Sequence, residues 1–502
     1  MTAPKVSLRI GQNLWEEMRA HILQPDNDEH GGALLCGIST TNSGIRLLGA
    51  KFLLAEDGVD YVPGTRGYRE LTAAFIRKTI VKARDEGLVC LLVHGHGDGY
   101  SVAFSETDNA SHERGYPALR DISGQTVGAL VLASGAIAGD IWHKDGFRSE
   151  LDVAVIIGAN VRRLTPSPRA GLAVRPEDDR QAKLFGEVGQ QLLRTTRIGI
   201  VGAGGAGMLA VEMLSRLGVG ELVVIDPDKV ELSNLTRLPG ARPLDACRIL
   251  TKPDRPEWIQ RVGSRLSRHK VHVARRLARQ AGQGTRVEAY PTDVRESPAA
   301  TALLDCDYIV LAADSAAARH LINIVSHQYL IPMIQVGVKI PVDKTGAVGD
   351  VFTAVRPVTP DGGCLRCAGL IDASRLAQEL LPDPLQRRLA DYGTGQAAPS
   401  VITLNGMSVS EALTYATFSL TGLNTIDATT HIRNHPRRGY KAVGEPSRDS
   451  SCPVCGGTGI TARGDLKNLP LPRSMSTAGQ PSIVGRMRRI LAWVAKVKPI
   501  SR

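Results

Sequence analysis

The sequence predicts an α/β protein built from more than one domain. At 502 residues the chain is too long for a single hydrophobic core. Short apolar runs typical of buried strands alternate with segments whose apolar residues recur at helical spacing. A stretch rich in proline, arginine and glycine, residues 162–179, separates two such regions and is predicted to be a linker.

The first region, residues 1–161, is predicted to be a mixed α/β domain. Apolar residues at helical spacing predict one helix at residues 14–22 and a second from Glu70 to Arg84. Gly87 follows the second helix where a C-terminal cap is expected. Strands are predicted at residues 32–37, 45–50, 88–94, 127–134 and 136–142.

The net charge of +11 is concentrated at the end of the chain. Residues 468–502 contain seven basic residues and no acid, and the apolar residues of "IVGRMRRILAWVAKVK" predict an amphipathic helix there. The charge therefore predicts a basic tail rather than a nucleic-acid-binding domain. No run of 18 uncharged apolar residues and no signal-peptide pattern is present, so we expect a cytoplasmic protein without a membrane span.

A glycine turn opens the second region. Residues 197–226 read as strand, turn, helix and strand, and Gly202, Gly204 and Gly207 satisfy the pattern GxGxxG. Such glycines permit a tight turn and let backbone approach phosphate at a helix N-terminus. Asp226 ends the next strand, where a carboxylate binds ribose hydroxyls. These residues alone would also suit an NAD-dependent dehydrogenase.

The residues after Asp226 favour a different class. The segment "DPDKVELSNLTR" resembles the signature of the ubiquitin-activating-enzyme superfamily, the ThiF/MoeB-type adenylyltransferases. The segments "RQAKLFGEVGQQLL", "HKVHVARRLARQ" and "VLAADSAAARHLIN" follow in that family's order, over roughly residues 180–460. The resemblance implies a Rossmann-like parallel-sheet adenylyltransferase domain, which we expect over residues 180–467.

The resemblance also implies individual roles for charged residues. Asp226 would bind the ATP ribose, and Asp314 would hold Mg²⁺. Arg180 matches an arginine that reaches the ATP of a partner subunit, which implies a homodimer. The triphosphate would be held by Gly202, Gly204, Gly205, Gly207, Asn234, Arg237 and Lys270. Phosphate charge calls for such a set, because arginine clamps phosphate bidentately and lysine supplies a point charge.

Arg237 and Lys270 are 33 residues apart, farther than is usual in the family. We therefore expect an insertion between them, and Lys270 is the loosest of these matches. The insertion carries Cys247, the one internal candidate for a thioester-forming cysteine.

Four of the eight cysteines form two CxxC pairs, at Cys364 and Cys367 and at Cys452 and Cys455. Each pair can place two thiolates on one metal ion, and two pairs give the Cys₄ set of a closed structural zinc site. A redox pair and a site that has lost its metal are the alternatives. Cys36 and Cys90 lie in apolar runs and are expected in the core.

Residues 368–451 contain no cysteine, although many ubiquitin-activating enzymes use one after the first CxxC pair. The enzyme is therefore expected to stop at the acyl-adenylate, or to pass the activated tail to a conjugating-enzyme-like partner.

The first region carries its own candidate site, in "VHGHGDGYSVAFSETD". His94 and His96 point the same way by strand alternation, and Asp108 can add a carboxylate. Three ligands and one open position for water are the pattern of a catalytic zinc site. Ser105 could donate a hydrogen bond to a tetrahedral oxyanion.

This stretch resembles the JAB/MPN (JAMM) metalloprotease motif, HxH followed by SxxD, with Glu29 in the place of the family's general base. Two departures stand out. Gly97 occupies the position where proline is usual, and eight residues rather than seven separate His96 from Ser105. A polar loop that binds no metal, and a family member without catalysis, remain open alternatives.

Together, the two regions predict an enzyme with two activities on a small ubiquitin-like protein. One region would cleave a peptide or isopeptide bond at that protein's C-terminus with a catalytic zinc ion. The other would adenylate the carboxylate with ATP and Mg²⁺, beside a structural zinc ion. Alternatives are an adenylyltransferase for sulfur-carrier proteins and a non-catalytic scaffold that binds ubiquitin-like proteins.

Overall fold

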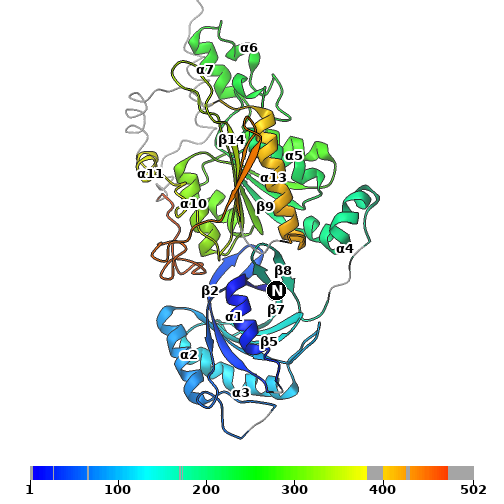
Figure 1. Cartoon of the computed structure of the whole chain (residues 1–502), viewed down its shortest axis with the longest axis vertical. Coiled ribbons are helices and arrows are strands. Elements are labelled where there is room, and N and C mark those ends of the chain that lie inside the picture. The colour runs from blue at the N-terminus through cyan, green and yellow to red at the C-terminus, as the bar shows by residue number, and fades with distance from the viewer. Residues whose placement is uncertain are drawn as a thin grey trace, which may run out of the picture.

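The computed structural model describes residues 4–26, 28–64, 67–168, 171, 173–381, 399–425 and 430–472. The predicted amphipathic helix near the C-terminus lies outside these residues. The described part forms two β-sheets of eight strands each, one in each half of the chain, and Figure 1 shows the two halves stacked along the long axis of the molecule.

The first sheet curls so that its first strand pairs with two others. The strand order is β1-β3-β2-β4-β5-β6-β7-β8, and β1 also pairs with β7. The strands are β1 (Val6–Gly11), β2 (Gly31–Thr41), β3 (Gly44–Leu54), β4 (Val89–Gly95), β5 (Val127–Ala133), β6 (Ala136–Trp142), β7 (Arg148–Ile157) and β8 (Val161–Leu164). Because β8 pairs with β7, residues 162–164 belong to the sheet, and the predicted linker begins later than residue 162.

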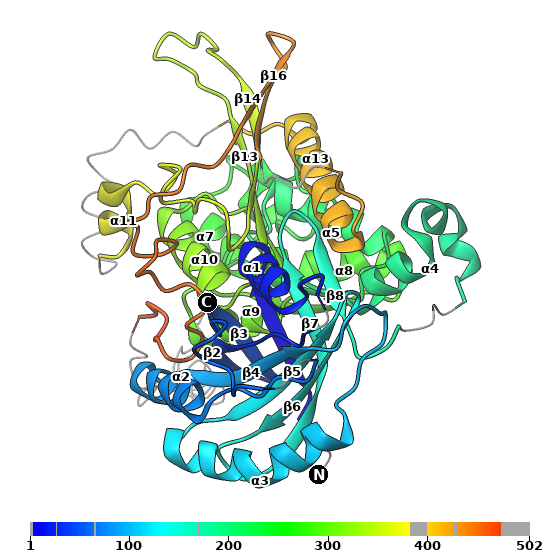
Figure 2. The same cartoon turned by 60° about the horizontal axis from the view of Figure 1, so that its bottom comes forward.

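Three helices cover the two faces of this sheet (Figures 1 and 2). Helix α1 (Gln12–Ile22) packs Trp15, Met18 and Ile22 into one apolar cluster. Helix α2 (Ala73–Glu86) contributes to a second cluster and ends as predicted, with Gly87 in the left-handed conformation. Helix α3 (Glu106–Ser123) packs its Tyr116 into that second cluster.

The second sheet has the order β11-β10-β9-β12-β13-β14-β15-β16. Its first five strands are parallel, and the last three run antiparallel. The strands are β9 (Arg197–Val201), β10 (Glu221–Ile225), β11 (Arg286–Tyr290), β12 (Tyr308–Leu311), β13 (Met333–Lys339), β14 (Phe352–Val358), β15 (His431–His435) and β16 (Tyr440–Gly444). The chain leaves β9 toward β10 on one side and later places β12 on the other, so a topological switch point lies at the carboxyl end of β9.

Helices cover both faces of the second sheet, as expected for a parallel sheet. One face carries α5 (Gly205–Arg216), α8 (Lys270–Ala281) and α13 (Ile402–Thr421), whereas the other carries α9 (Ser297–Leu304) and α10 (Ala316–Gln328). Helix α4 (Asp179–Thr195) precedes β9, and the short α11 (Ala373–Glu379) lies beside α10.

The predicted insertion between Arg237 and Lys270 folds as two helices, α6 (Arg248–Thr251) and α7 (Glu257–Leu266). They project from the end of the molecule that lies farthest from the first sheet (Figure 1). No helix in the described part of the chain has the length and apolar character needed to cross a bilayer.

Two buried arginines join the halves. Arg46 of β3 donates hydrogen bonds to the backbone oxygens of Leu304 and Asp305, at the C-terminal end of α9. Arg9 of β1 donates to the oxygen of Cys306 at 3.1 Å. Arg9 is 3% exposed and Arg46 is 8% exposed. Carbonyl groups that α9 leaves unpaired are therefore satisfied by the first half of the chain.

Replacing Arg46 with alanine is expected to destabilise the protein by about 2–4 kcal/mol, because at least two buried carbonyls lose their donor. Urea unfolding would measure the change. The matched control is Arg286→Ala, since the Arg286 side chain is 78% exposed and pairs with Glu221 at the surface. That control should change stability by less than about 1 kcal/mol. Equal effects of the two substitutions would contradict a structural role for Arg46.

Candidate functional sites

The glycine turn lies at the switch point of the second sheet. Gly202 has a φ of +95°, and a Cβ there would lie 2.8 Å from the nitrogen of Ala313. A Cβ on Gly207 would lie 1.8 Å from the oxygen of Gly202, so neither position accepts a side chain. A Cβ on Gly204, in contrast, would meet nothing within 4 Å. The turn thus packs tightly inward and leaves open space in front of Gly204, where phosphate could approach.

Asp226, at the end of β10, is held against this turn. It is 6% exposed, and its Oδ2 accepts a hydrogen bond of 2.7 Å from the backbone N–H of Ala203. Its Oδ1 accepts one of 2.8 Å from Asp228. Burial raises the pKa of Asp226, and Lys270 opposes that rise. Each carboxylate oxygen keeps a further lone pair, so Asp226 can still accept a hydrogen bond from a ribose hydroxyl.

Lys270, which follows the insertion in sequence, also lies beside Asp226. It is the first residue of α8, and its Nζ lies 2.7 Å from Asp228 Oδ2 and 3.9 Å from Asp226 Oδ1. Its side chain is only 12% exposed. Helices α6 and α7 project outward from the domain, and the chain after α7 leads to the start of α8 beside Asp226. Lys270 therefore lies near the glycine turn despite the length of the insertion.

Asn234 and Arg237 lie on the segment that follows Asp226. Asn234 is 7% exposed, and its Oδ1 accepts a hydrogen bond from the N–H of Glu231. Arg237 is half-buried and donates from Nη1 to the oxygen of Ser233 at 2.9 Å. A Cβ on Gly205 would lie 3.1 Å from the oxygen of Arg237, so this segment packs on the turn.

Two of the expected nucleotide-site residues are exposed. Asp314 follows the carboxyl end of β12, and Arg180 lies on α4. Neither takes part in an ion pair within the part of the chain that the structure describes. An exposed carboxylate at the carboxyl edge of the sheet suits Mg²⁺, which prefers oxygen ligands and keeps several waters. Cys247 lies at the N-cap position of α6 and is half-exposed.

The four cysteines of the CxxC pairs form one cluster. The sulfur of Cys364 lies 3.7 Å from that of Cys367 and 3.8 Å from that of Cys452, and the Cys367 and Cys455 sulfurs are 3.5 Å apart. A tetrahedral zinc ion with Zn–S bonds of about 2.3 Å holds its sulfurs about 3.8 Å apart. The donor set and its dimensions therefore fit a structural zinc ion.

His94, His96 and Asp108 form a second cluster with ligand geometry. Nε2 of His94 lies 3.2 Å from Nε2 of His96, and Asp108 Oδ2 lies 3.6 Å and 3.5 Å from these two nitrogens. A tetrahedral zinc ion with bonds of about 2.0–2.1 Å separates its ligand atoms by about 3.3–3.4 Å. We call these residues the metal triad, because the spacing of their ligand atoms is close to that of one face of such a tetrahedron.

Gly97 lies in the loop between His96 and Asp108. Its φ is +71°, a conformation that proline cannot adopt. The loop turns at Gly97 after His96 and reaches the N-terminus of α3, where Asp108 lies in the first turn. The convergence of the three side chains does not depend on a proline.

The surroundings of the metal triad include both Ser105 and Glu29. Ser105 caps α3, and its hydroxyl donates to Asp108 Oδ2 at 2.7 Å, so it is engaged with a ligand atom rather than free for an oxyanion. Burial alone would raise the pKa of Asp108, but hydrogen bonds with His94, His96 and Ser105 lower it well below its usual range. Glu29 lies 4.0 Å from His96 Nε2, and burial raises the pKa of its carboxyl group.

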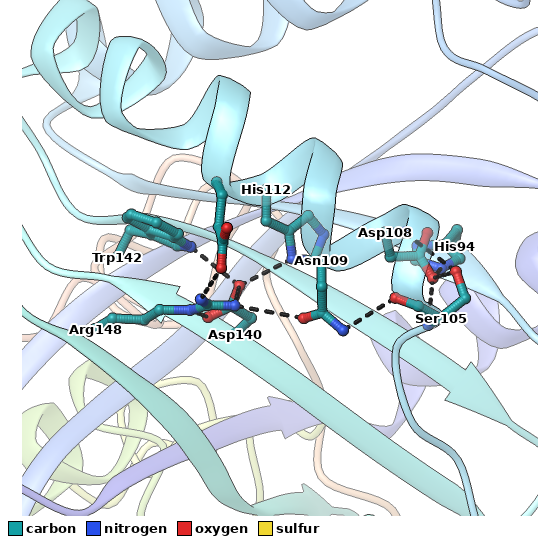
Figure 3. Close-up of polar contacts among 9 residues, drawn as sticks. His94, Ser105, Asp108, Asn109, His112, Asp140, Trp142 and Arg148 are labelled. Carbon is teal, nitrogen blue, oxygen red and sulfur yellow. Dashed lines mark hydrogen bonds and ion pairs between the residues drawn. The ribbon is translucent and has the colours of Figure 1, made fainter.

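A second polar network, which the sequence analysis missed, runs along α3 (Figure 3). Nδ1 of His112 lies 2.9 Å from Asp140 Oδ2, and both residues are buried. Trp142 and Arg148 also donate to Asp140, at 3.0 Å and 2.6 Å. Asn109 links Arg148 to the oxygen of Ser105. The only sequence signal was the helical spacing of Asp108 and His112.

The fold and the first of these sites define an α/β nucleotide-binding domain with its glycine turn at the switch point of a parallel sheet. Residues 178–454, more than half of the chain, match the ThiF family. The chain belongs to the ThiF family.

Relatives with assigned activities cover part of the chain. The SAMP-activating enzyme E1 of Haloferax volcanii is 29% identical over 182 residues, which are 36% of this chain and 56% of that protein. The sulfur carrier protein ThiS adenylyltransferase of Bacillus subtilis is 27% identical over 278 residues, 54% of this chain and 68% of that protein. The adenylyltransferase and sulfurtransferase UBA4 of Saccharomyces cerevisiae is 27% identical over 182 residues, 36% of this chain and 35% of that protein. The chain thus spans between about a third and two thirds of the length of these relatives.

Proposed function

We propose that the second half of the chain adenylates the C-terminal carboxylate of a small ubiquitin-like protein, with ATP and Mg²⁺. Membership of the ThiF family supports this proposal, together with the relatives named as E1-like and sulfur-carrier adenylyltransferases. The observation that carries it is the convergence of Asp226 and Lys270 on the glycine turn from segments far apart in sequence.

The residues at the turn suit this reaction. The substrate carboxylate attacks the α-phosphorus, the bond from that phosphorus to the bridging oxygen breaks, and pyrophosphate leaves. Lys270 and Arg237 would neutralise phosphate charge, and Asn234 would orient the chain of phosphates. Asp314 would hold Mg²⁺, which neutralises charge on the leaving pyrophosphate. Arg180, exposed on α4, would reach the partner's ATP in a homodimer.

Pyrophosphate exchange tests this function. Purified enzyme, ATP and labelled pyrophosphate would be combined with each small protein of ubiquitin-like fold from the same genome. Exchange with one of them is expected, and its absence with all of them would reject the proposal. A second assay separates the sulfur-carrier alternative: with an added sulfide donor the acyl-adenylate would give a thiocarboxylate and AMP, whereas in modifier activation an amine of an added target protein would displace AMP and form a conjugate.

We propose a second activity for the first half, the hydrolysis of a peptide or isopeptide bond at the same C-terminus. The carrying observation is the metal triad, whose ligand atoms lie at the spacing of a tetrahedral zinc site beside Glu29. Zinc, when bound, would lower the pKa of a water molecule to near neutrality. Glu29 would take a proton from the attacking water and give it to the leaving amine. Detection of this hydrolysis would also distinguish an enzyme from a non-catalytic binding scaffold.

We also propose that the protein is cytoplasmic. The cysteines of the two CxxC pairs lie close together as free thiols, and clustered free thiols persist in a reducing compartment such as the cytoplasm.

Replacing Glu29 with glutamine is expected to lower hydrolysis by about 10²–10⁴-fold, because the proton acceptor is lost. Zinc binding should persist, since Glu29 lies outside the metal triad. Cleavage would be followed by mass spectrometry on a C-terminally extended form of the small protein found by exchange, and zinc by metal analysis. His94→Ala is the companion variant. It should lose hydrolytic activity and the zinc ion of the metal triad, and it should keep the zinc ion of the four cysteines. Wild-type activity in Glu29→Gln would reject Glu29 as the base.

A further inference from the structure

A cavity of about 400 Å³ opens beside the metal triad. Glu29, His94 and Asp108 lie on its wall, so it is continuous with the proposed site of hydrolysis. It extends between α2, α3 and the strands β4 and β5. An apolar part of its wall is formed by Leu71, Ile76, Leu92, Ala118, Leu119 and Ala129. Tyr68, Arg69, Glu70 and Ser111 also line it. Space of this size and character fits a large apolar side chain, and a glycine would leave it empty.

His112 places a polar group beside the apolar part of this wall. It is 5% exposed, and the rings of Phe104 and Tyr116 meet it edge-on with centroids 4.8 Å away. Asp140, which accepts hydrogen bonds from Trp142 and Arg148, also accepts one from Nδ1 of His112. When Nδ1 carries the proton that is donated to Asp140, Nε2 is the ring nitrogen that can accept a hydrogen bond. Nothing in the described part of the chain hydrogen-bonds to that Nε2.

Gly115 shows that space remains along the helix. It lies on α3 and lines the same cavity, and a Cβ built on it would meet nothing within 4 Å. A side chain introduced there would therefore enter the cavity without displacing the protein. Alanine or leucine is also a better helix former than glycine, so such a substitution should not harm α3.

We propose that this cavity is a specificity pocket for the substrate residue next to the scissile bond. It selects a large apolar side chain that ends in a hydrogen-bond donor, which His112 Nε2 receives; tyrosine combines both properties. This inference rests on the proposed hydrolase function. Phenylalanine has no hydroxyl, so its binding would bury His112 Nε2 without a hydrogen-bond partner. The pocket should therefore bind tyrosine more tightly than phenylalanine.

Peptide binding to zinc-loaded Glu29→Gln tests the pocket without turnover. The probes are glycine-serine peptides that carry a single tyrosine, a single phenylalanine, or neither. The tyrosine peptide should bind at least about tenfold more tightly than the glycine-serine peptide, with the phenylalanine peptide between them. Equal binding of all three peptides, measured by calorimetry, would overturn the proposal.

Two further substitutions in the same background separate size from polarity. Gly115→Leu fills the cavity and should remove the preference for either aromatic residue, while Asp121→Leu adds the same side chain at an exposed position of α3 and should change nothing. His112→Phe should make the tyrosine and phenylalanine peptides bind equally. An unchanged preference in Gly115→Leu would overturn the pocket, and an unchanged advantage of tyrosine in His112→Phe would overturn the role of His112.

The outcomes also distinguish the pocket from the reaction. Selective binding by Glu29→Gln without cleavage of any tyrosine peptide by the zinc-loaded wild-type protein supports the pocket and rejects the hydrolase function. Cleavage by the wild-type protein without selective binding supports the hydrolase and rejects the pocket.

Discussion

Cys364→Ser is expected to release one zinc ion per chain and to lower the thermal stability of the protein. A structural zinc ion contributes on the order of 10 kcal/mol in small zinc-binding peptides near neutral pH. Loss of even about 3 kcal/mol would lower the melting temperature of a domain of this size by roughly 6–12 °C. The Cys₄ cluster joins segments 88 residues apart in sequence, so its loss would free the chain around residues 452–472.

Metal analysis and differential scanning calorimetry would measure both effects. Cys247→Ser is the matched control, because Cys247 is half-exposed on the insertion and lies outside the cluster. It should retain zinc and melt with the wild-type protein. A Cys364→Ser protein with full zinc content would contradict a shared Cys₄ site.

Lys270→Ala is expected to weaken ATP binding by roughly 10- to 100-fold, the cost of losing one charge-assisted hydrogen bond to phosphate. The Lys270 side chain is held beside Asp226 and Asp228, so its charge is already directed at the glycine turn. Titration calorimetry with ATP and Mg²⁺ would measure the change. Lys441→Ala removes a surface lysine paired with Glu411 and serves as control. An unchanged affinity would mean that Lys270 only neutralises the two aspartates.

Regular periodicity and capping residues made several elements predictable. The helix that ends at Gly87 was expected because its apolar residues recur at helical spacing and glycine follows. Helix α3 was missed, since it is mostly polar and contains Pro117. Its local signals were the capping box formed by Ser105 and Asp108 at its start and Gly124 after its end, and the first two residues had been assigned to the HxH…SxxD motif instead.

The candidate sites were predictable where one local segment carries them. Strand alternation placed His94 and His96 on one side, and the structure brings their Nε2 atoms together. Contacts between distant segments carry no such local pattern. The pairing of His112 with Asp140 depends on how α3 lies across β6, and the position of Lys270 depends on how the insertion returns.

The contact of Arg46 with the end of α9 shows which edge of the second sheet lies against the first half of the chain. Asp305 and Cys306 lie just before β12 and accept hydrogen bonds from Arg46, whereas Asp314 follows β12, so the first half of the chain contacts the amino edge of the second sheet and Asp314 lies at the opposite, carboxyl edge. Figure 1 accordingly shows α3 and the insertion helices at opposite ends of the molecule. The hydrolysis proposed beside α3 and the adenylation proposed at the carboxyl edge of the second sheet would therefore take place at separate positions, and a protein tail bound at one of them would have to leave it to reach the other.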